Sequence, residues 1–397
     1  MFGLTLLALA TSASAGPSSL SSRQTSPFIT TPITDFAEPW SLAFLPDNRI
    51  LVTEKNGVLR LVDPATKAKG TITGVPTVSY GGQGGLGDVA LHPNFASNNL
   101  VYISYAESGS GGAGAAVARA ELVLNANGGG SLENLEVIWR QSQKVSATGH
   151  YSHRILFEGV NSTTMWIASG DRQVMDPAQS MSSNLGKILR LNDDGSVPVG
   201  NPFTGTPADQ VWALGVRNPL GIDFDEQGRL WEIEMGPMGG DEINLMEKGA
   251  NYGWPLVSEG SHYDGRAIPN HSTRPEFNPP KVFWNPVISP SSVIIYKGDL
   301  FSSWKGNAII SALGAQGLVR VEITGDTARE AQRIGLGRRT RCVRQDSDGA
   351  LWVLEDGAGG SLIKLTPRSE MESLANKRTA VFLQPLLIFF VSFLFLM

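Results

Sequence analysis

A short strand pattern recurs along the chain and constrains the fold more than any other feature. Three segments share it closely: LPDNRILVTE at 45–54, FDEQGRLWEIE at 224–234 and QDSDGALWVLE at 345–355. In each segment, a polar turn that contains Asp precedes a mostly apolar run that ends near Glu. Internal repetition of this kind is typical of repeat architectures, in which similar units stack against one another.

Six related units of uneven length can be traced through the chain. They begin near Asp47, Asn98, Asn161, Asp225, Gly306 and Asp346. A propeller blade takes about 40–50 residues, so the longer gaps must hold insertions. We therefore predict an all-β fold, a six-bladed β-propeller over residues 25–367, whose loops converge on a central channel. A pair of large β-sandwiches is the alternative.

Composition narrows the classes of protein and partner. The chain has 397 residues, of which 41% are hydrophobic, enough for a large core. Cys342 is the single cysteine, which excludes an intrachain disulfide framework and a cysteine-based zinc site. The net charge is −5 and no basic block stands out, so nucleic acid is not expected as a partner.

Both ends of the chain carry targeting signals. The apolar run at 2–10 and the small residues Ala13-Ser14-Ala15 predict a signal peptide over 1–15, and hence a secreted protein. At the other end, 380–397 form an uncharged tail behind a polar spacer at 368–379. This tail is either a membrane span or the signal for a lipid anchor, and we favour the anchor, on the extracellular face of the membrane. Sequons at Asn161 and Asn270 are compatible with that location.

A histidine and an aspartate are candidates for acid–base chemistry. His150 lies in TGHYSHRILFEG (148–159) just before an apolar run, and Asp171 ends the next run, MWIASGD. The two side chains are therefore expected at the same rim. A carboxylate beside an imidazole fixes its tautomer, which a general base requires. The alternatives are a surface histidine and an aspartate that caps a turn.

Several polar residues indicate a ligand with negative charges. Arg217 lies between apolar runs and needs an anionic partner, either internal or a ligand. Arg339 and Arg341 share one face if the segment is extended, which suits a ligand with several carboxylates or else a solvated edge strand. Gln83 lies among four glycines, where the backbone can approach a planar ligand closely. The oxygen-rich segment 234–255 suits calcium, without EF-hand spacing.

Taken in order, the motifs resemble one family. They are GQGGLGDVALHP, GHYSHRILF followed by GD, LGKILR, GVRNPLGIDF, GPMGGDEINLMEKGANYGWP, WKGN and RTRCVRQDSDGALWVLED. From about Phe36 to Thr366 the chain is similar to pyrroloquinoline-quinone (PQQ)-dependent sugar dehydrogenases of the soluble glucose/sorbosone type, above all to bacterial aldose sugar dehydrogenases. The resemblance implies a six-bladed propeller with the quinone in its central channel.

The resemblance also implies roles for individual residues. His150 would take the proton from the anomeric hydroxyl of the sugar, Asp171 would orient His150, and Arg217 would stabilise charge on the quinone carbonyl. The positions that match cofactor contacts are Gln83, Asn218, Tyr263, Arg339 and Arg341. The main-chain oxygens of Gly236 and Pro237 would bind a calcium ion at the cofactor. Glu242 and Tyr252 match a second, structural calcium site.

Departures from the family pattern leave the function open. Gly314 stands where the family commonly has a lysine that contacts the quinone, and Met235 stands where Gln or His is frequent. The first interpretation is an enzyme that oxidises aldoses to lactones with PQQ and calcium and passes electrons to an acceptor. The second is a non-catalytic propeller ectodomain that binds a protein or glycan, and a metal-dependent lactone hydrolase is the third.

Overall fold

The computed structural model describes residues 26–159 and 162–368. The predicted signal peptide, nearly all of the predicted spacer, the apolar tail and the sequon residue Asn161 lie outside the described residues. Within the two described ranges, no helix is long and apolar enough to cross a membrane.

The largest sheet has eight strands in the order β2-β3-β4-β5-β9-β8-β7-β6. One half comprises β2 (Pro39–Phe44), β3 (Ile50–Glu54), β4 (Val58–Val62) and β5 (Lys69–Thr73). The other half comprises β6 (Leu86–Leu91), β7 (Leu100–Gly109), β8 (Gly112–Leu124) and β9 (Gly130–Arg140), with the short helix α1 (Phe95–Asn98) after β6. Each half is an antiparallel meander, and a short parallel pairing between β5 and β9 joins the two halves.

Three further sheets of four strands follow along the chain. The first contains β10 (Ile155–Phe157), β11 (Thr164–Ser169), β12 (Lys187–Asn192) and β13 (Val211–Leu214). The second contains β14 (Pro219–Phe224), β15 (Leu230–Glu234), β17 (Asp241–Met246) and β19 (Val282–Trp284). The third contains β20 (Pro290–Ile295), β21 (Ala308–Ala312), β22 (Gly317–Thr324) and β23 (Thr327–Gly335). A two-stranded ribbon of β16 (Met238–Gly239) and β18 (Gly260–Ser261) and four short 3₁₀ turns, at Asp176–Gln179, Ala208–Gln210, His271–Thr273 and Ser302–Trp304, lie in the connections.

The last sheet joins the two ends of the described chain. It contains β24 (Thr340–Gln345), β25 (Leu351–Glu355), β26 (Gly360–Pro367) and, as its outer strand, β1 (Phe28–Phe36). The antiparallel register pairs Phe28 with Pro367 and Phe36 with Gly360. Because β1 precedes all other strands, this pairing closes the arrangement through hydrogen bonds between the beginning and the end of the fold.

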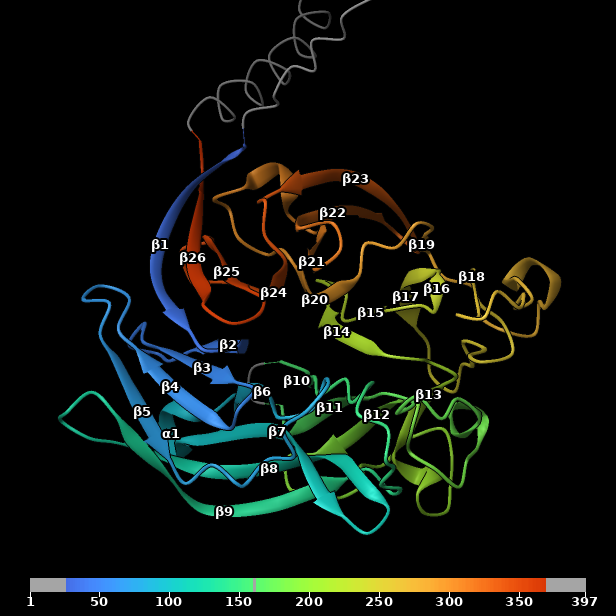
Figure 1. The fold of residues 1–397 in the computed structure, drawn as a ribbon, viewed down its shortest axis with the longest axis horizontal. Coiled ribbons are helices and arrows are strands. Elements are labelled where there is room, and N and C mark those ends of the chain that lie inside the picture. Colours follow the sequence, from blue (N-terminus) through green and yellow to red (C-terminus); the bar gives the residue numbers. More distant parts are fainter. Residues whose placement is uncertain (1–25, 160–161, 369–397) are drawn as a thin grey trace, which may run out of the picture.

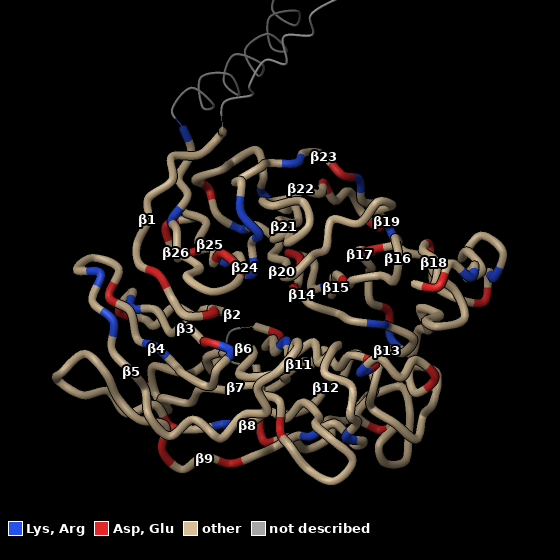
Figure 2. Tube along the Cα trace, in the orientation of Figure 1, with Lys and Arg blue, Asp and Glu red and all other residues tan. Residues whose placement is uncertain are grey.

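The innermost strands form a closed ring. β2 contacts β6, β6 contacts β10, and the contacts continue through β14, β20 and β24 back to β2. Figure 1 shows the sheets arranged radially around this ring, and Figure 2 shows acidic and basic positions inside the ring as well as on its periphery. The described chain is therefore an all-β protein of the propeller type, not a pair of sandwiches.

The recurring sequence pattern corresponds to one kind of turn. The turns at Asp47, Asp225 and Asp346 each connect the innermost strand of a sheet with the strand beside it. The Asp225 and Asp346 carboxylates accept hydrogen bonds from backbone N–H groups of their own turns. Each also accepts a bond from a tryptophan indole, Trp231 at 2.9 Å and Trp352 at 2.7 Å. The repeat thus encodes a turn closed by its own side chain.

Replacing Asp225 by alanine is expected to lower the free energy of unfolding by about 2–3 kcal/mol, because the buried Trp231 indole loses its acceptor. Asp326→Ala is the matched control, since Asp326 contacts the same Arg229 but is 74% exposed. That control should cost at most about 1 kcal/mol. Denaturant unfolding measures both variants, and equal costs would contradict this explanation of the repeat.

Candidate active site

The loop before β10 has an unusual backbone. His150, Ser152 and His153 have φ values of 51°, 65° and 68°, in the left-handed region that side chains disfavour. Its neighbours hold the loop in place: the Arg172 guanidinium donates to a main-chain carbonyl of the loop at 2.7 Å. The His150 N–H donates to Gln83 Oε1 at 2.7 Å. Strained backbone held by several contacts is frequent at functional sites.

His150 and Asp171 form the hydrogen-bonded pair that the sequence predicted. His150 Nδ1 lies 2.6 Å from Asp171 Oδ1, and both side chains are buried. Asp171 Oδ1 also accepts the N–H of Gln173, and Oδ2 accepts the indole N–H of Trp254 at 2.7 Å. With Nδ1–H directed at the carboxylate, Nε2 carries the free lone pair. No side chain in the described residues hydrogen-bonds to His150 Nε2.

The environment keeps the pair in a neutral-imidazole, charged-carboxylate state. Burial lowers the pKa of His150 below 6.5, although the hydrogen bond to Asp171 acts in the opposite direction. Burial, the largest single influence, acts to raise the pKa of Asp171, but the hydrogen bonds from His150 and Gln173 and the nearby charge of Arg217 together bring the net pKa below 3.8. Near neutral pH, His150 is therefore a base with an available nitrogen.

Arg217 lies beside this pair, and no carboxylate of the described residues forms a salt bridge with its guanidinium. Its Nη1 donates to the carbonyls of Met235 at 2.9 Å and Gly236 at 2.6 Å, and Nη2 donates to the hydroxyl of Tyr263 at 3.2 Å. Within the described ranges, Arg217 Nε and Asn218 Nδ2 are buried and have no hydrogen-bond partner. Buried donors and a buried positive charge without an anion are costly, so these groups fit an anionic or carbonyl-bearing ligand.

Two adjoining cavities make up one cleft at the ends where the inner strands begin. The first, of about 330 Å³, is lined by His150, Asp171, Arg217, Pro237 and Tyr263 among others. The second, of about 290 Å³, is lined by Lys55, Gln83, Met235, Arg339 and Arg341 among others. The His150–Gln83 and Arg217–Met235 hydrogen bonds connect the two walls. Eight of the residues predicted from sequence therefore line one cleft.

Arg339 and Arg341 point the same way, but toward an internal carboxylate. Arg339 Nε lies 2.9 Å from Asp356 Oδ2, and Arg341 Nη2 lies 2.6 Å from Asp356 Oδ1. Sequence analysis missed Asp356, whose signal was the acidic residue that ends LWVLED. It also missed Lys55, which donates to Glu38 at 2.6 Å at the edge of the same cavity.

The backbone around Gly314 leaves little room for a side chain at this position, where the family commonly has a lysine. A Cβ atom at Gly314 would approach Ser289 Oγ at 2.8 Å and the carbonyl oxygen of Ile288 at 2.9 Å. The Gly314 N–H donates to that same carbonyl at 2.9 Å. The backbone is thus too close for a side chain without local movement, and the lysine that lines the cavity is Lys55.

Acceptor groups gather next to the segment predicted to bind calcium. Glu242 in β17 lies opposite Glu234 in β15, and both are buried with Glu232. Burial raises the pKa of Glu234 to about 7, and burial and the Glu234 charge raise that of Glu242 well above 4.5. Glu232 Oε1 and Asn244 Oδ1 are buried acceptors that receive no hydrogen bond from the part of the chain that the structure describes. Such a donor-poor, oxygen-rich set fits a cation or bound protons.

The remaining predicted calcium ligands are placed as follows. Gly236 O accepts from Arg217, Pro237 lines the cleft, and the main-chain oxygen of Tyr252 lies 3.0 Å from His271 Nε2. Across the residues that the structure describes, no three His, Cys, Asp or Glu side chains are grouped so that they could hold a metal. Any calcium at these positions would therefore need main-chain oxygens in addition to a carboxylate such as that of Glu242.

A propeller with a buried imidazole–carboxylate pair and guanidinium groups at one mouth of its channel has the architecture of a ligand-binding enzyme. The family model described as "Glucose / Sorbosone dehydrogenase" matches residues 36–364. The chain belongs to this family, as its motifs predicted.

Relatives agree with this assignment. An aldose sugar dehydrogenase of Escherichia coli is 37% identical over 83% of this chain and 90% of its own length. Quinoprotein glucose dehydrogenase B of Acinetobacter calcoaceticus is 26% identical over 85% and 90%. The apo crystal structure of the soluble E. coli aldose sugar dehydrogenase has a TM-score of 0.79 at 36% identity, covering 86% of this chain and all of that one. A PQQ-bound aldose sugar dehydrogenase of Streptomyces coelicolor, at 24% identity and a TM-score of 0.70, shares the fold.

Proposed function

We propose that the protein is a quinoprotein oxidoreductase that oxidises the anomeric hydroxyl of aldoses to lactones, with PQQ and calcium. The observation that carries this proposal is the neutral His150 held by Asp171 beside the unpaired, buried Arg217. The named relatives, an aldose sugar dehydrogenase and a quinoprotein glucose dehydrogenase, support the reaction class and the cofactor. We further propose six blades, which the ring of inner strands and the two-part, eight-stranded sheet support.

His150 performs the proton transfer in this proposal. Its Nε2 accepts the proton of the sugar hydroxyl while Nδ1–H stays bonded to Asp171, which stabilises the resulting imidazolium. Asp171 is held in turn by Trp254 and Gln173, so the ring orientation is set before the sugar arrives. Bound PQQ would supply the two-electron acceptor that no side chain provides.

The cations of the cleft hold the cofactor in this proposal. Arg217 and Asn218 offer buried donors without protein acceptors to its carbonyl oxygens. Gln83, Tyr263, Arg339 and Arg341 line the walls, and the two latter arginines would share their charge between Asp356 and the cofactor carboxylates. An electron acceptor that remains to be identified then regenerates the enzyme.

The test is direct. The purified apo protein, loaded with PQQ and calcium, is expected to reduce an artificial dye when aldoses are added, and not when alditols without an anomeric hydroxyl are added. Fluorescence titration measures PQQ binding separately from activity. Saturable PQQ binding without dye reduction across a panel of aldoses would contradict the proposed reaction.

A second candidate is a non-catalytic ectodomain that binds a protein or glycan. Two observations favour it: Arg339 and Arg341 already pair with the Asp356 carboxylate, and Gly314 presents no cation. This candidate predicts that PQQ does not bind even with calcium present. The absence of PQQ binding to folded protein would therefore select it over the dehydrogenase.

Calcium is expected to stabilise the fold through main-chain oxygens and Glu242. Removing it with a chelator should lower the melting temperature, because an ion bound only by the folded state stabilises by about 2.7 kcal/mol at 100-fold excess over Kd. Glu242→Gln should abolish most of this calcium dependence, whereas the exposed-site variant Glu276→Gln should retain it. A melting temperature that changes neither with chelator nor with added calcium would exclude the two calcium sites.

For the location, we propose a secreted protein held at the extracellular face of the membrane by a lipid anchor, with 1–15 and the 380–397 tail removed. The uncharged tail and the small residues before it support this proposal. Phosphatidylinositol-specific phospholipase should then release the protein from cells. Protein that stays in the membrane pellet and retains the tail, seen by mass spectrometry, would indicate a span instead.

A further inference from the structure

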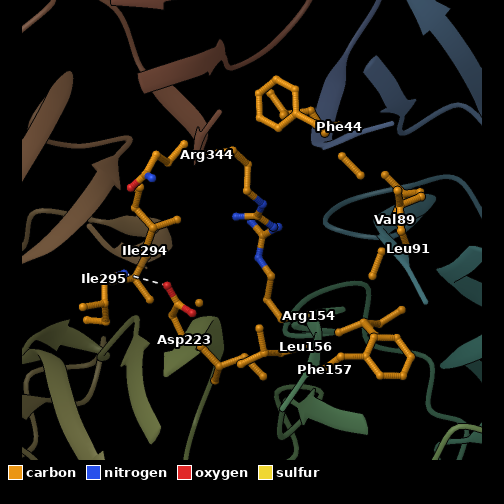
Figure 3. A pocket seen from close by; sticks show the side chains of 18 of the residues that line it. Phe44, Val89, Leu91, Arg154, Leu156, Phe157, Asp223, Ile294, Ile295 and Arg344 are labelled. Carbon is orange, nitrogen blue, oxygen red and sulfur yellow. Dashed lines mark hydrogen bonds between the residues drawn. The ribbon is translucent and has the colours of Figure 1, made fainter. Parts of the chain in front are cut away.

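A separate cavity lies in the channel at the opposite ends of the inner strands. It measures about 390 Å³ and is lined by residues from all six strands of the inner ring. Along β24, Arg341 lines the cleft and Arg344 lines this cavity; along β14, the same holds for Leu220 and Asp223. Figure 3 shows the cavity, with the side chains of Arg154 and Arg344 reaching into its centre.

Arg154 separates the cavity from the cleft. Its Nε donates to the carbonyl of Leu220 at 2.5 Å, and Nη2 donates to the carbonyl of Ser291 at 2.7 Å. Its Nη1 lies 3.2 Å from Asp88 Oδ1. Arg154 is buried, and all three of its nitrogens are used by the protein. It therefore forms a fixed cationic floor.

Arg344 is the cation that remains available. Its Nη1 donates to the carbonyl of Val343 at 3.1 Å, and its Nη2 lies 3.5 Å from the same Asp88 oxygen that Arg154 uses. Asp88 Oδ1 also accepts the hydroxyl of Ser41 at 2.5 Å. Among the described residues, no carboxylate pairs with Arg344 more closely than this shared one. Two guanidinium groups beside one carboxylate leave a positive charge uncompensated.

The other charged groups of the cavity do not change this balance. Asp223 accepts the N–H of Ile295 at 2.6 Å and of Phe224 at 2.8 Å, and lies 3.6 Å from Lys297 Nζ. Lys297 therefore neutralises Asp223, as Arg154 neutralises Asp88. Three cations thus face two carboxylates in the described chain, and Arg344 remains as the cation in excess.

Apolar side chains form much of the remaining wall. Phe44, Leu91, Leu156 and Phe157 are only partly buried, and Figure 3 shows them around the cavity. Cavities of about 300–1,000 Å³ that combine apolar walls with a few polar groups are typical small-molecule sites. We propose that this cavity binds a small carboxylate with an apolar body, its carboxylate on Arg344 and its body against Phe44, Leu91 and Phe157. This site is independent of the proposed dehydrogenase activity.

Hexanoate is a suitable probe, followed by isothermal titration calorimetry on the apo protein. Wild type should bind it saturably, and acetate and 1-hexanol should each bind at least about tenfold more weakly, because each lacks one of the two contacts. Arg344→Ala should weaken hexanoate binding at least about tenfold. Arg329→Ala, which removes an exposed arginine of β23, should leave it unchanged. Melting curves establish that each variant is folded.

Two further variants locate the bound probe. Leu91→Trp should fill the cavity and abolish binding without removing a charge, which decides the question if Arg344→Ala does not fold. Arg339→Ala should have no effect, since Arg339 lies in the cleft. The proposal is overturned if wild type shows no saturable binding, if 1-hexanol or acetate binds as tightly as hexanoate, or if binding depends on Arg339 and not on Arg344 or Leu91.

Discussion

Turnover with an aldose is expected to fall by about 10²–10⁴-fold when His150 is replaced by alanine, while folding and PQQ affinity change little. The variant loses the only imidazole nitrogen that the described structure directs into the cleft with a free lone pair and a carboxylate behind it. Dye-coupled kinetics measure kcat, and fluorescence titration measures PQQ affinity in the same preparation.

The control for this variant is His92→Ala. His92 is also buried and also contacts an aspartate, Asp193 at 3.1 Å, but it does not line the cleft. Its loss should cost stability and leave kcat within about threefold of wild type, since it makes no contact in the transition state. Equal kcat losses in the two variants, or turnover of His150→Ala within threefold of wild type, would remove His150 from the mechanism.

The second large effect is expected at Asp171. Asp171→Asn should lower kcat by roughly 10²–10⁴-fold, because an amide cannot accept from His150, Gln173 and Trp254 together. If the nitrogen of the introduced amide faces His150, it donates a hydrogen bond to Nδ1. The imidazole proton must then sit on Nε2, which can no longer accept the proton of the sugar hydroxyl. KM should change far less than kcat, which separates loss of the correct tautomer from loss of sugar binding.

A pH profile distinguishes this role from a purely structural one. In wild type, burial lowers the His150 pKa below 6.5, so the acid limb of kcat/KM, on which His150 becomes protonated, should have its midpoint below pH 6.5. The Asp171 carboxylate raises the His150 pKa, so its removal should shift the acid limb to still lower pH. An acid limb at the same or higher pH in Asp171→Asn would contradict direct coupling of the two groups.

The sequence predicted the parts of the fold that are encoded locally. The turns at Asp225 and Asp346 are closed by side chains within six residues, so their pattern is visible in the sequence. The pairing of β1 with β26 joins residues such as Phe28 and Pro367, and no local pattern specifies such a distant partner.

The site was predictable in its residue types and less so in its contacts. His150 precedes β10 and Asp171 follows β11, the next strand and its antiparallel neighbour, so their meeting could be inferred from order along the chain. The ion pairs of Arg341 with Asp356 and of Lys55 with Glu38 could not be inferred from the sequence, because such partners depend on how neighbouring sheets face the channel. The left-handed backbone at His150 was also invisible, since it is imposed by neighbours such as Arg172 and not by glycine.

The central claim is that His150 is the base for oxidation of an aldose by bound PQQ. Anaerobic single-turnover mixing of the PQQ- and calcium-loaded protein with glucose tests it most directly, with reduction of the quinone followed by its absorbance. Wild type should reduce its bound quinone in one rapid phase, and His150→Ala, loaded to the same extent, should do so about 10²–10⁴-fold more slowly. Equal rates in the two proteins, or no reduction of fully bound quinone in wild type by any aldose, would contradict the claim.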